Sequence, residues 1–171
     1  MDQALGRYVV IGASGILAPL GLLLRSRQLH TVGISRGSRL EAGVWDERVA
    51  LDTQDAAAVT HWVAHQRRDV AAVIAYSPAL APPSWPMMSR LTEHVVVVAT
   101  SRWAEPGSPD GPWASLAAVV VVQLGWAQTA QGSRWHTPYE VSAAVAHELA
   151  EASTPRTVVV GSLRPWSARP G

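Results

Sequence analysis

Residues 7–18 read RYVVIGASGILA: a short β-branched run, a glycine turn and the start of an apolar stretch with helical periodicity. In this G-x-x-G-x-x-A pattern, Gly12 allows a tight turn, Gly15 lets the backbone approach a pyrophosphate, and Ala18 keeps the helix close to the sheet. Free N–H groups at the helix start would bind the phosphates. The turn therefore predicts a dinucleotide site formed by Gly12, Ala13, Ser14, Gly15 and Ile16. The alternative is a tight turn in a scaffold that has lost its ligand, and Pro19 counts slightly against the site because it removes an N–H donor.

Further apolar runs alternate with helical patterns along the rest of the chain. Strands are expected at 7–11, 31–34, 48–51, 70–75, 94–100, 116–124 and 156–162. Helices are expected at 16–27, 55–67, 87–93 and about 137–151, the last beginning with a Thr-Pro-Tyr-Glu capping box. Continuous Val-rich strands are typical of a parallel sheet covered on both faces. The pattern predicts a doubly wound, mostly parallel, Rossmann-like α/β fold in one compact domain over residues 1–171.

Composition excludes several classes of function. The chain has 171 residues, 48% hydrophobic, and a net charge of +1, so we expect no nucleic acid partner. No apolar run has the length of a membrane span and no signal pattern begins the chain, so we expect a cytoplasmic protein. Cysteine is absent and all 14 basic residues are arginine, which excludes thiol nucleophiles, lysine Schiff bases and a Tyr-Lys proton relay. His61 and His65 have helical metal-pair spacing but no third ligand nearby, so we expect no metal.

The region Tyr8–Arg36 resembles the first βαβ unit of the short-chain dehydrogenase/reductase superfamily, and the resemblance extends over most of the chain. It implies an NAD(P) cofactor, with Asp52 as the acidic contact to adenine and Ser101 in place of the catalytic serine. Residues 133–140 and 163–166 look like a small bacterial subgroup of this length. The chain departs from the family between Ser101 and Leu116, where 14 residues with three prolines cannot form the helix that carries the catalytic Tyr-Lys pair. That role is therefore not transferred to Tyr139.

The end of the second strand bears on the choice between NAD and NADP. In these folds an acidic residue there favours NAD, whereas a basic residue accommodates the 2′-phosphate of NADP. No acid stands at this place. The residues present are Ser35, Arg36, Ser38 and Arg39, which could hold a phosphate through guanidinium and hydroxyl groups. NADP is therefore favoured over NAD, and the alternative is a solvated turn that happens to contain arginines.

Three residues are candidates for moving a proton or holding a substrate. Tyr76 follows the fourth strand, at the end where such sheets bind ligands, so its hydroxyl is expected to face the nicotinamide of the cofactor or the substrate; the alternative is an aromatic packing residue. Ser101 either bonds a substrate heteroatom or only terminates the fifth strand. His136 is either a donor near neutral pH or a loop histidine without function. Without a Tyr-Lys pair, an imine or an already cationic iminium suits the site better than an unactivated ketone, although a ketone with another acid stays open.

Three functions follow from these patterns. The first is an NADP-dependent reductase of a small or medium apolar imine or carbonyl compound. The second is a redox-silent NADP-binding sensor or partner subunit, and the third is a non-redox enzyme such as a cyclase or dehydratase. Tryptophans after the fourth to sixth strands could line an apolar substrate pocket or an oligomer interface, and we expect a homo-oligomer; they are Trp85, Trp103, Trp113, Trp126 and Trp135.

Overall fold

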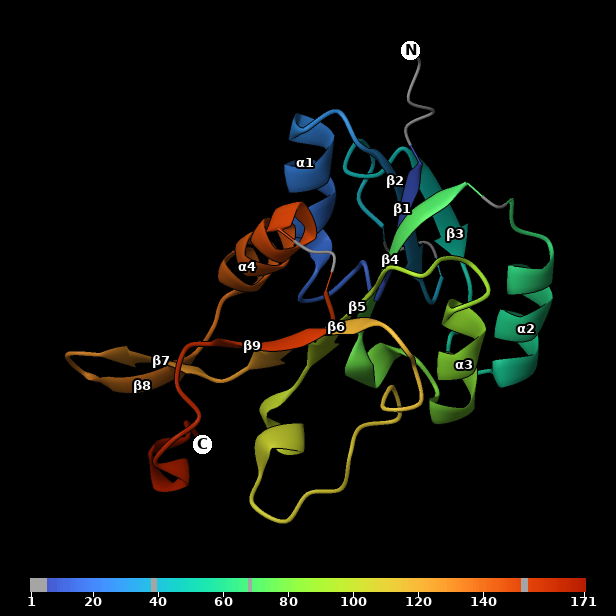
Figure 1. The fold of residues 1–171 in the computed structure, drawn as a ribbon. Helices are drawn as coiled ribbons and strands as arrows, with labels where there is room; N and C mark the ends of the chain where they lie inside the picture. The colour runs from blue at the N-terminus through green and yellow to red at the C-terminus, as the bar shows by residue number, and fades with distance from the viewer. Residues whose placement is uncertain (1–5, 38–39, 68, 152–153) are drawn as a thin grey trace.

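A seven-stranded parallel sheet forms the centre of the protein, with strand order β3-β2-β1-β4-β5-β6-β9. The computed structural model describes residues 6–171 except 38–39, 68 and 152–153. The strands are β1 (Arg7–Ile11), β2 (His30–Ser35), β3 (Glu47–Ala50), β4 (Val70–Tyr76), β5 (Val95–Ala99), β6 (Val119–Leu124) and β9 (Arg156–Val160). The predicted Rossmann-like fold is confirmed, and each predicted strand is present (Figure 1).

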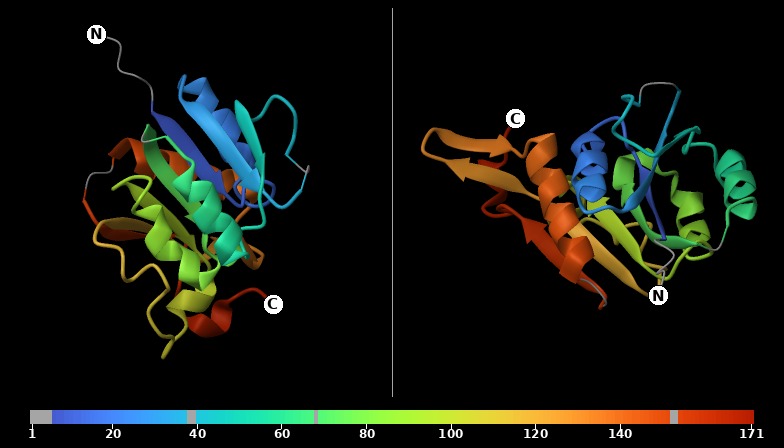
Figure 2. Two further views of the ribbon diagram at one scale, coloured as in Figure 1. Left: turned by 90° about the vertical axis from the view of Figure 1, so that its right-hand side faces the viewer. Right: turned by 90° about the horizontal axis from the view of Figure 1, so that it is seen from above.

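Helices cover both faces of this sheet (Figures 1 and 2). On one face, α1 (Ala18–Ser26) and α4 (Pro138–Glu151) lie side by side, and on the other lie α2 (Ala56–Ala64) and α3 (Trp85–Met88). The valines of β5 supply both faces, because successive side chains of a strand point to opposite sides. The result is two hydrophobic layers, one on each side of the sheet. None of the helices in the described part of the chain has the length and apolar character to cross a bilayer.

The helix starts follow the capping chemistry expected from the sequence. The Thr137 backbone N–H donates to Glu140 Oε2 at 2.8 Å, and the Glu140 N–H donates to Thr137 Oγ1 at 3.2 Å, which confirms the capping box of α4. α1 begins at Ala18 rather than at residue 16, so Pro19 lies in the first turn, where no helical hydrogen bond is lost. The expected helix at 87–93 is wrong in its bounds, because α3 ends at Met88.

The connection between β5 and β6 contains a short 3-10 turn, Ser101–Ala104, and no α-helix. The loop covers the sheet with aromatic side chains instead: Trp113 packs edge-on against Trp85 at 5.5 Å between ring centroids and against Trp103 at 5.2 Å. Trp85 and Trp113 are buried. These three tryptophans therefore replace a covering helix, and the expectation that they line a pocket or an interface is wrong for the two buried rings.

An antiparallel hairpin, β7 (Trp126–Thr129) and β8 (Gly132–Trp135), was not expected from the sequence. It extends from the carboxyl end of β6 and leads into α4 (Figure 1). Its base is held by aromatic contacts, since the buried Trp126 ring packs edge-on against Trp135 and against Trp166 near the C-terminus. The hairpin therefore lies at the carboxyl edge of the sheet, where α/β folds bind ligands.

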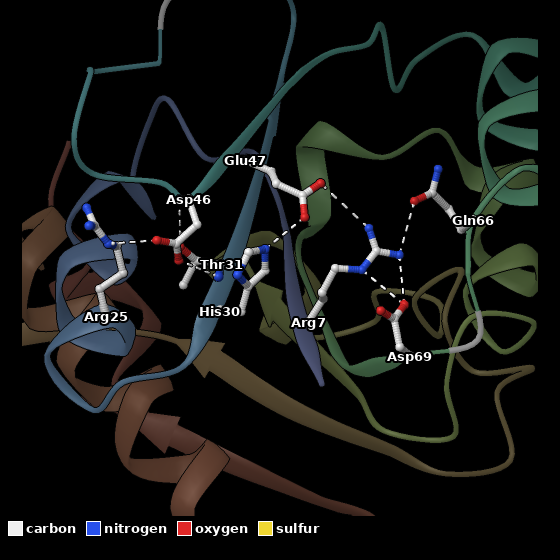
Figure 3. Close-up of polar contacts among 8 residues, drawn as sticks. All are labelled: Arg7, Arg25, His30, Thr31, Asp46, Glu47, Gln66 and Asp69. Carbon is white, nitrogen blue, oxygen red and sulfur yellow. Dashed lines mark hydrogen bonds and ion pairs between the residues drawn. The ribbon is translucent and has the colours of Figure 1, made fainter. Parts of the chain in front are cut away.

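Charged side chains join the opposite, amino ends of the strands (Figure 3). Arg7 on β1 donates to Asp69 at 3.1 Å and pairs with Glu47 on β3 at 3.7 Å. Glu47 also contacts His30 Nε2 on β2 at 2.8 Å. Because this network lies at the end of the sheet remote from the glycine turn, we interpret it as a brace between strands rather than part of a ligand site.

A second polar cluster, in which Asp46 contacts Thr31 and Arg25, contributes to stability in a pH-dependent way (Figure 3). Burial opposes the ionisation of Asp46, but hydrogen bonds from the Thr31 N–H and Oγ1, at 2.8 and 2.9 Å, and the charges of Arg25 and His30 outweigh burial and lower the pKa of Asp46 below its ordinary value of 3.8. The carboxylate therefore stabilises the fold above the ordinary pKa, and this contribution is lost as the pH falls through the lowered one.

We expect Asp46→Asn to lower the melting temperature by about 4 °C at about pH 7, because a charge-assisted pair of hydrogen bonds is weakened. At about pH 2 the variant and the wild type should melt at closer temperatures, because the contribution of the carboxylate is lost as the pH falls through its lowered pKa. Thermal unfolding followed by circular dichroism at the two pH values tests this. Glu105→Gln, at an exposed carboxylate, is the control and should show no such change. A difference that does not shrink in acid would contradict the role of the Asp46 charge.

Candidate active site

The carboxyl ends of β1 and β4 form the point where strand order reverses. β1 pairs with β2 on one side and with β4 on the other, so the chain leaves the two central strands in opposite directions. Gly12 directly follows β1, and Tyr76 ends β4. Doubly wound folds bind ligands in the crevice at such a switch point. The strand order therefore places the glycine turn and Tyr76 at the edge of a candidate ligand site.

An open cleft of about 970 Å³ lies at this switch point. It is lined by eleven residues from the ends of β1, β2, β3 and β4: Gly12, Ser14, Gly15, Ser35, Arg36, Gly37, Thr53, Gln54, Tyr76, Pro78 and Ala79. The size is suited to a dinucleotide rather than to a single small metabolite. Six of the residues predicted for the cofactor lie on its wall, namely Gly12, Ser14, Gly15, Ser35, Arg36 and Tyr76.

The other predicted cofactor residues lie elsewhere. Ala13 is buried in the core beneath the turn, and Ile16 lines an adjoining pocket. Asp52 is exposed and does not line the cleft, since its carboxylate caps the following turn by accepting the Gln54 N–H at 3.1 Å. The next two residues, Thr53 and Gln54, line the cleft instead, and neither was predicted from the sequence. Arg39 and Ser38 lie outside the described residues.

The two glycines of the turn have different roles. Gly12 has a positive φ of +88°, and a Cβ there would lie 3.0 Å from Tyr76 Cβ, so the residue is needed for the turn itself. A Cβ at Gly15 would meet nothing within 4 Å, and Gly15 is exposed on the cleft wall. The backbone at Gly15 is thus left uncovered at the side of the cleft, as the close approach of a pyrophosphate would require. The cleft and its turn fit a dinucleotide.

A second, smaller pocket of about 250 Å³ adjoins the cleft. Its nine lining residues come from the turn after β1, the ends of β4 and β6, the segment after β5, the end of the hairpin and the first turns of α4: Ile16, Tyr76, Thr100, Ser101, Leu124, Gly125, Trp135, His136 and Val141. The fold thus brings Tyr76, Ser101 and His136 to one pocket, although they are far apart in sequence. Tyr76 belongs to both cavities and stands between them.

Tyr76 is half-buried between the two cavities, and burial raises the pKa of its phenol above the ordinary value of 10.0. The hydroxyl therefore stays protonated through the neutral and mildly alkaline range. Because no hydrogen bond within the described part of the chain engages this hydroxyl, it is available to a ligand in either cavity. Tyr76 is thus a candidate proton donor, because its phenol stays protonated and the residue lines both cavities.

His136 is held by the protein rather than free to act on a ligand. Its ring is 11% exposed, with Nε2 at 3.2 Å from the Val160 carbonyl oxygen and Nδ1 at 3.7 Å from Glu140 Oε2. Glu140 is bound in turn by Arg134 through two contacts of 2.7 and 2.8 Å, and these hydrogen bonds hold the pKa of its carboxyl well below the usual range. Both ring nitrogens thus face protein groups, which argues against His136 as the proton donor.

The fold and these two cavities place the protein among Rossmann-type proteins that have a large cleft at the switch point and a smaller pocket beside it. No family model and no curated protein matches the sequence. Solved structures match across most of the chain, however. A short-chain dehydrogenase of Burkholderia cenocepacia in complex with NADP has 16% sequence identity and a TM-score of 0.65, and the match covers 95% of this chain and 91% of that one.

Two further structures support the same conclusion about the fold. A short-chain dehydrogenase/reductase of Vibrio parahaemolyticus has 12% identity and a TM-score of 0.61, with coverage of 90% of this chain and 98% of that one. A short-chain dehydrogenase of Streptomyces avermitilis has 16% identity and a TM-score of 0.56, with coverage of 95% and 90%. At these identities the likeness is one of fold. The protein has a fold similar to that of these short-chain dehydrogenases, as its first βαβ unit led us to expect.

Proposed function

We propose that the protein is an NADP-dependent reductase of a small or medium apolar imine, iminium or carbonyl compound. The observation that carries this proposal is the position of Tyr76, which forms the boundary between the dinucleotide-sized cleft and the small pocket that holds Ser101. A cofactor in the cleft would thus end where a substrate in the pocket begins. A bound dihydronicotinamide would supply a hydride to such a substrate.

The cleft residues support NADP as the cofactor. Gly15 and the start of α1 would face the pyrophosphate. Arg36 and Ser35 lie at the end of β2, where the adenosine ribose binds in such folds, and their guanidinium and hydroxyl groups suit a 2′-phosphate. Arg36 is exposed, so it is free to form a bidentate contact. The NADP bound in the Burkholderia cenocepacia structure is consistent with this choice.

Binding of the cofactor is the first test. We expect NADPH to bind with micromolar affinity and NADH at least about tenfold more weakly, because only NADPH offers the 2′-phosphate to Arg36. The chain contains eight tryptophans, so their emission and its energy transfer to the nicotinamide report binding directly. Equal affinities for the two nucleotides would contradict the phosphate site, and no binding of either would contradict the reductase.

Arg36→Ala provides the matched variant for this titration. It should weaken the binding of NADPH by about tenfold to a hundredfold and leave the affinity for NADH nearly unchanged, since the lost contact is one charge-assisted hydrogen-bonded pair. Arg102→Ala, at an exposed arginine outside the cleft, should change neither affinity. An equal loss of affinity for NADPH and NADH in Arg36→Ala would show that the arginine supports the cleft but does not bind the 2′-phosphate.

A redox-silent NADP-binding sensor or subunit is the second candidate function. It is favoured by the loop between β5 and β6, which contains no α-helix to carry a catalytic pair, and by the commitment of both His136 nitrogens to protein groups. This candidate shares the cofactor cleft with the reductase, so binding alone does not separate them. Loss of NADPH absorbance with a panel of imines and ketones favours the reductase. Tight NADPH binding without turnover of any of them favours the sensor, and a non-redox enzyme is favoured only if neither nucleotide binds.

A further inference from the structure

We propose that the small pocket selects a cationic, apolar group and that the ring of Trp135 is the residue that recognises the charge. The proposal deepens the proposed function and rests on it in one respect, namely that the small pocket receives the substrate. It chooses among the substrate classes left open above: an iminium cation is favoured over a neutral carbonyl compound and over any anion.

The charges around the pocket support this choice. None of its nine lining residues is an aspartate, a glutamate or an arginine. Arg134, the basic residue next to Trp135 in the chain, is paired with Glu140 by two contacts of 2.7 and 2.8 Å. The N-terminus of α4 is capped by the same carboxylate. An anionic group in the pocket would therefore lose its hydration without gaining a guanidinium or the start of α4 as a partner, which is costly.

The aromatic wall supports a cation. Trp135 is 42% exposed at the end of β8 and lines the pocket. Its ring stands nearly perpendicular to the fully buried ring of Trp126, at 84° and 6.4 Å between centroids. The buried partner thus helps fix the orientation of an exposed ring before any ligand arrives. Tryptophan is the aromatic residue that attracts cations most strongly, and a fixed ring loses little entropy on binding.

The rest of the lining suits the apolar body of such a ligand. Ile16, Leu124 and Val141 contribute aliphatic surface from three different elements. Tyr76, Thr100 and Ser101 bring hydroxyl groups to the lining, and a neutral hydroxyl can accept a contact from a cation. The pocket thus combines aliphatic side chains with an aromatic ring and has no carboxylate or guanidinium among its lining residues, surroundings in which a desolvated organic cation gains from an aromatic face.

The test compares a cation with a neutral analogue of the same shape and with an anion that carries the same phenyl ring. Phenyltrimethylammonium is the cation, tert-butylbenzene is its neutral carbon analogue and benzoate is an anion. Binding to the full chain is measured by calorimetry, with and without NADPH. We expect the cation to bind about tenfold more tightly than the neutral analogue, and benzoate to bind least. In Trp135→Leu the preference for the cation should fall to about twofold or less, while the affinity for the neutral analogue changes little.

Two controls separate this proposal from a structural effect and from the proposed function. Trp62→Leu changes a half-buried tryptophan on α2, outside the pocket, and should keep the preference for the cation. NADPH titration of the same variants reports the cleft independently. Equal binding of cation and neutral analogue to the wild type, or an equal loss of both in Trp135→Leu, would overturn the role of Trp135. Absence of NADPH binding would overturn the reductase instead and would leave the measured charge preference of the pocket standing.

Discussion

Gly15→Leu is expected to weaken NADPH binding by about a hundredfold or more while the protein remains folded. A side chain at this position would project into the cleft, because a Cβ there meets no atom within 4 Å, and it would cover the backbone that a pyrophosphate approaches. The backbone at Gly15 does not have the positive φ that makes a side chain unfavourable, so the substitution strains nothing. Fluorescence titration and thermal unfolding of the same sample measure the two effects.

Gly12→Ala is the matched variant for this prediction. Here the φ of +88° and the Tyr76 Cβ at 3.0 Å oppose any side chain, so stability should fall together with binding. Comparison of the two variants thus distinguishes a glycine needed for ligand binding, Gly15, from a glycine needed for folding, Gly12. Unchanged NADPH affinity in Gly15→Leu would remove the phosphate site from this turn. Unfolding of Gly15→Leu would show that the residue serves the turn as Gly12 does.

The sequence predicted the parallel sheet well because each strand is a local pattern. Val95–Ala99 and Val119–Leu124 are nearly continuous valine runs, which only a strand covered on both faces accommodates. The hairpin at 126–135 was missed for the converse reason. Its strands have four residues each, and it is held by Trp126 packing against Trp166, a contact that no local pattern contains.

The residues of the candidate site also divide into those that a local sequence pattern predicts and those that it does not. Gly12, Gly15 and Arg36 could be predicted because they belong to one βαβ unit with a recognisable local pattern. Thr53 and Gln54 could not be predicted, because the neighbouring Asp52 matched the family pattern and was chosen instead. Only the structure shows that the Asp52 carboxylate accepts the Gln54 N–H and so caps a turn. The pocket residue Trp135 depends on the hairpin, so it could not be distinguished from the buried tryptophans by sequence.

Tyr76→Phe is expected to lower kcat/KM for a ketone by about a hundredfold to ten-thousandfold, the usual contribution of a general acid. An alkoxide formed from a ketone needs a proton, and the Tyr76 hydroxyl lies between the cleft and the pocket in its protonated form. For a cationic iminium the loss should be less than about tenfold, because the product amine needs no proton from the enzyme. Rates are followed by the loss of NADPH absorbance with one ketone and one iminium of similar size.

The pH dependence and the cofactor affinity make this prediction specific to the proton. Because burial raises the pKa of Tyr76 above 10.0, ketone reduction should not lose its proton donor until the solution is strongly alkaline. The Phe ring keeps the wall between the cavities, so NADPH affinity should change by less than about threefold. Small losses for both substrates would make Tyr76 an aromatic lining residue and leave Thr100 and Ser101 as the hydroxyl groups in the pocket. Large and equal losses with weaker NADPH binding would show that the ring positions the cofactor, and the proton would then have another source.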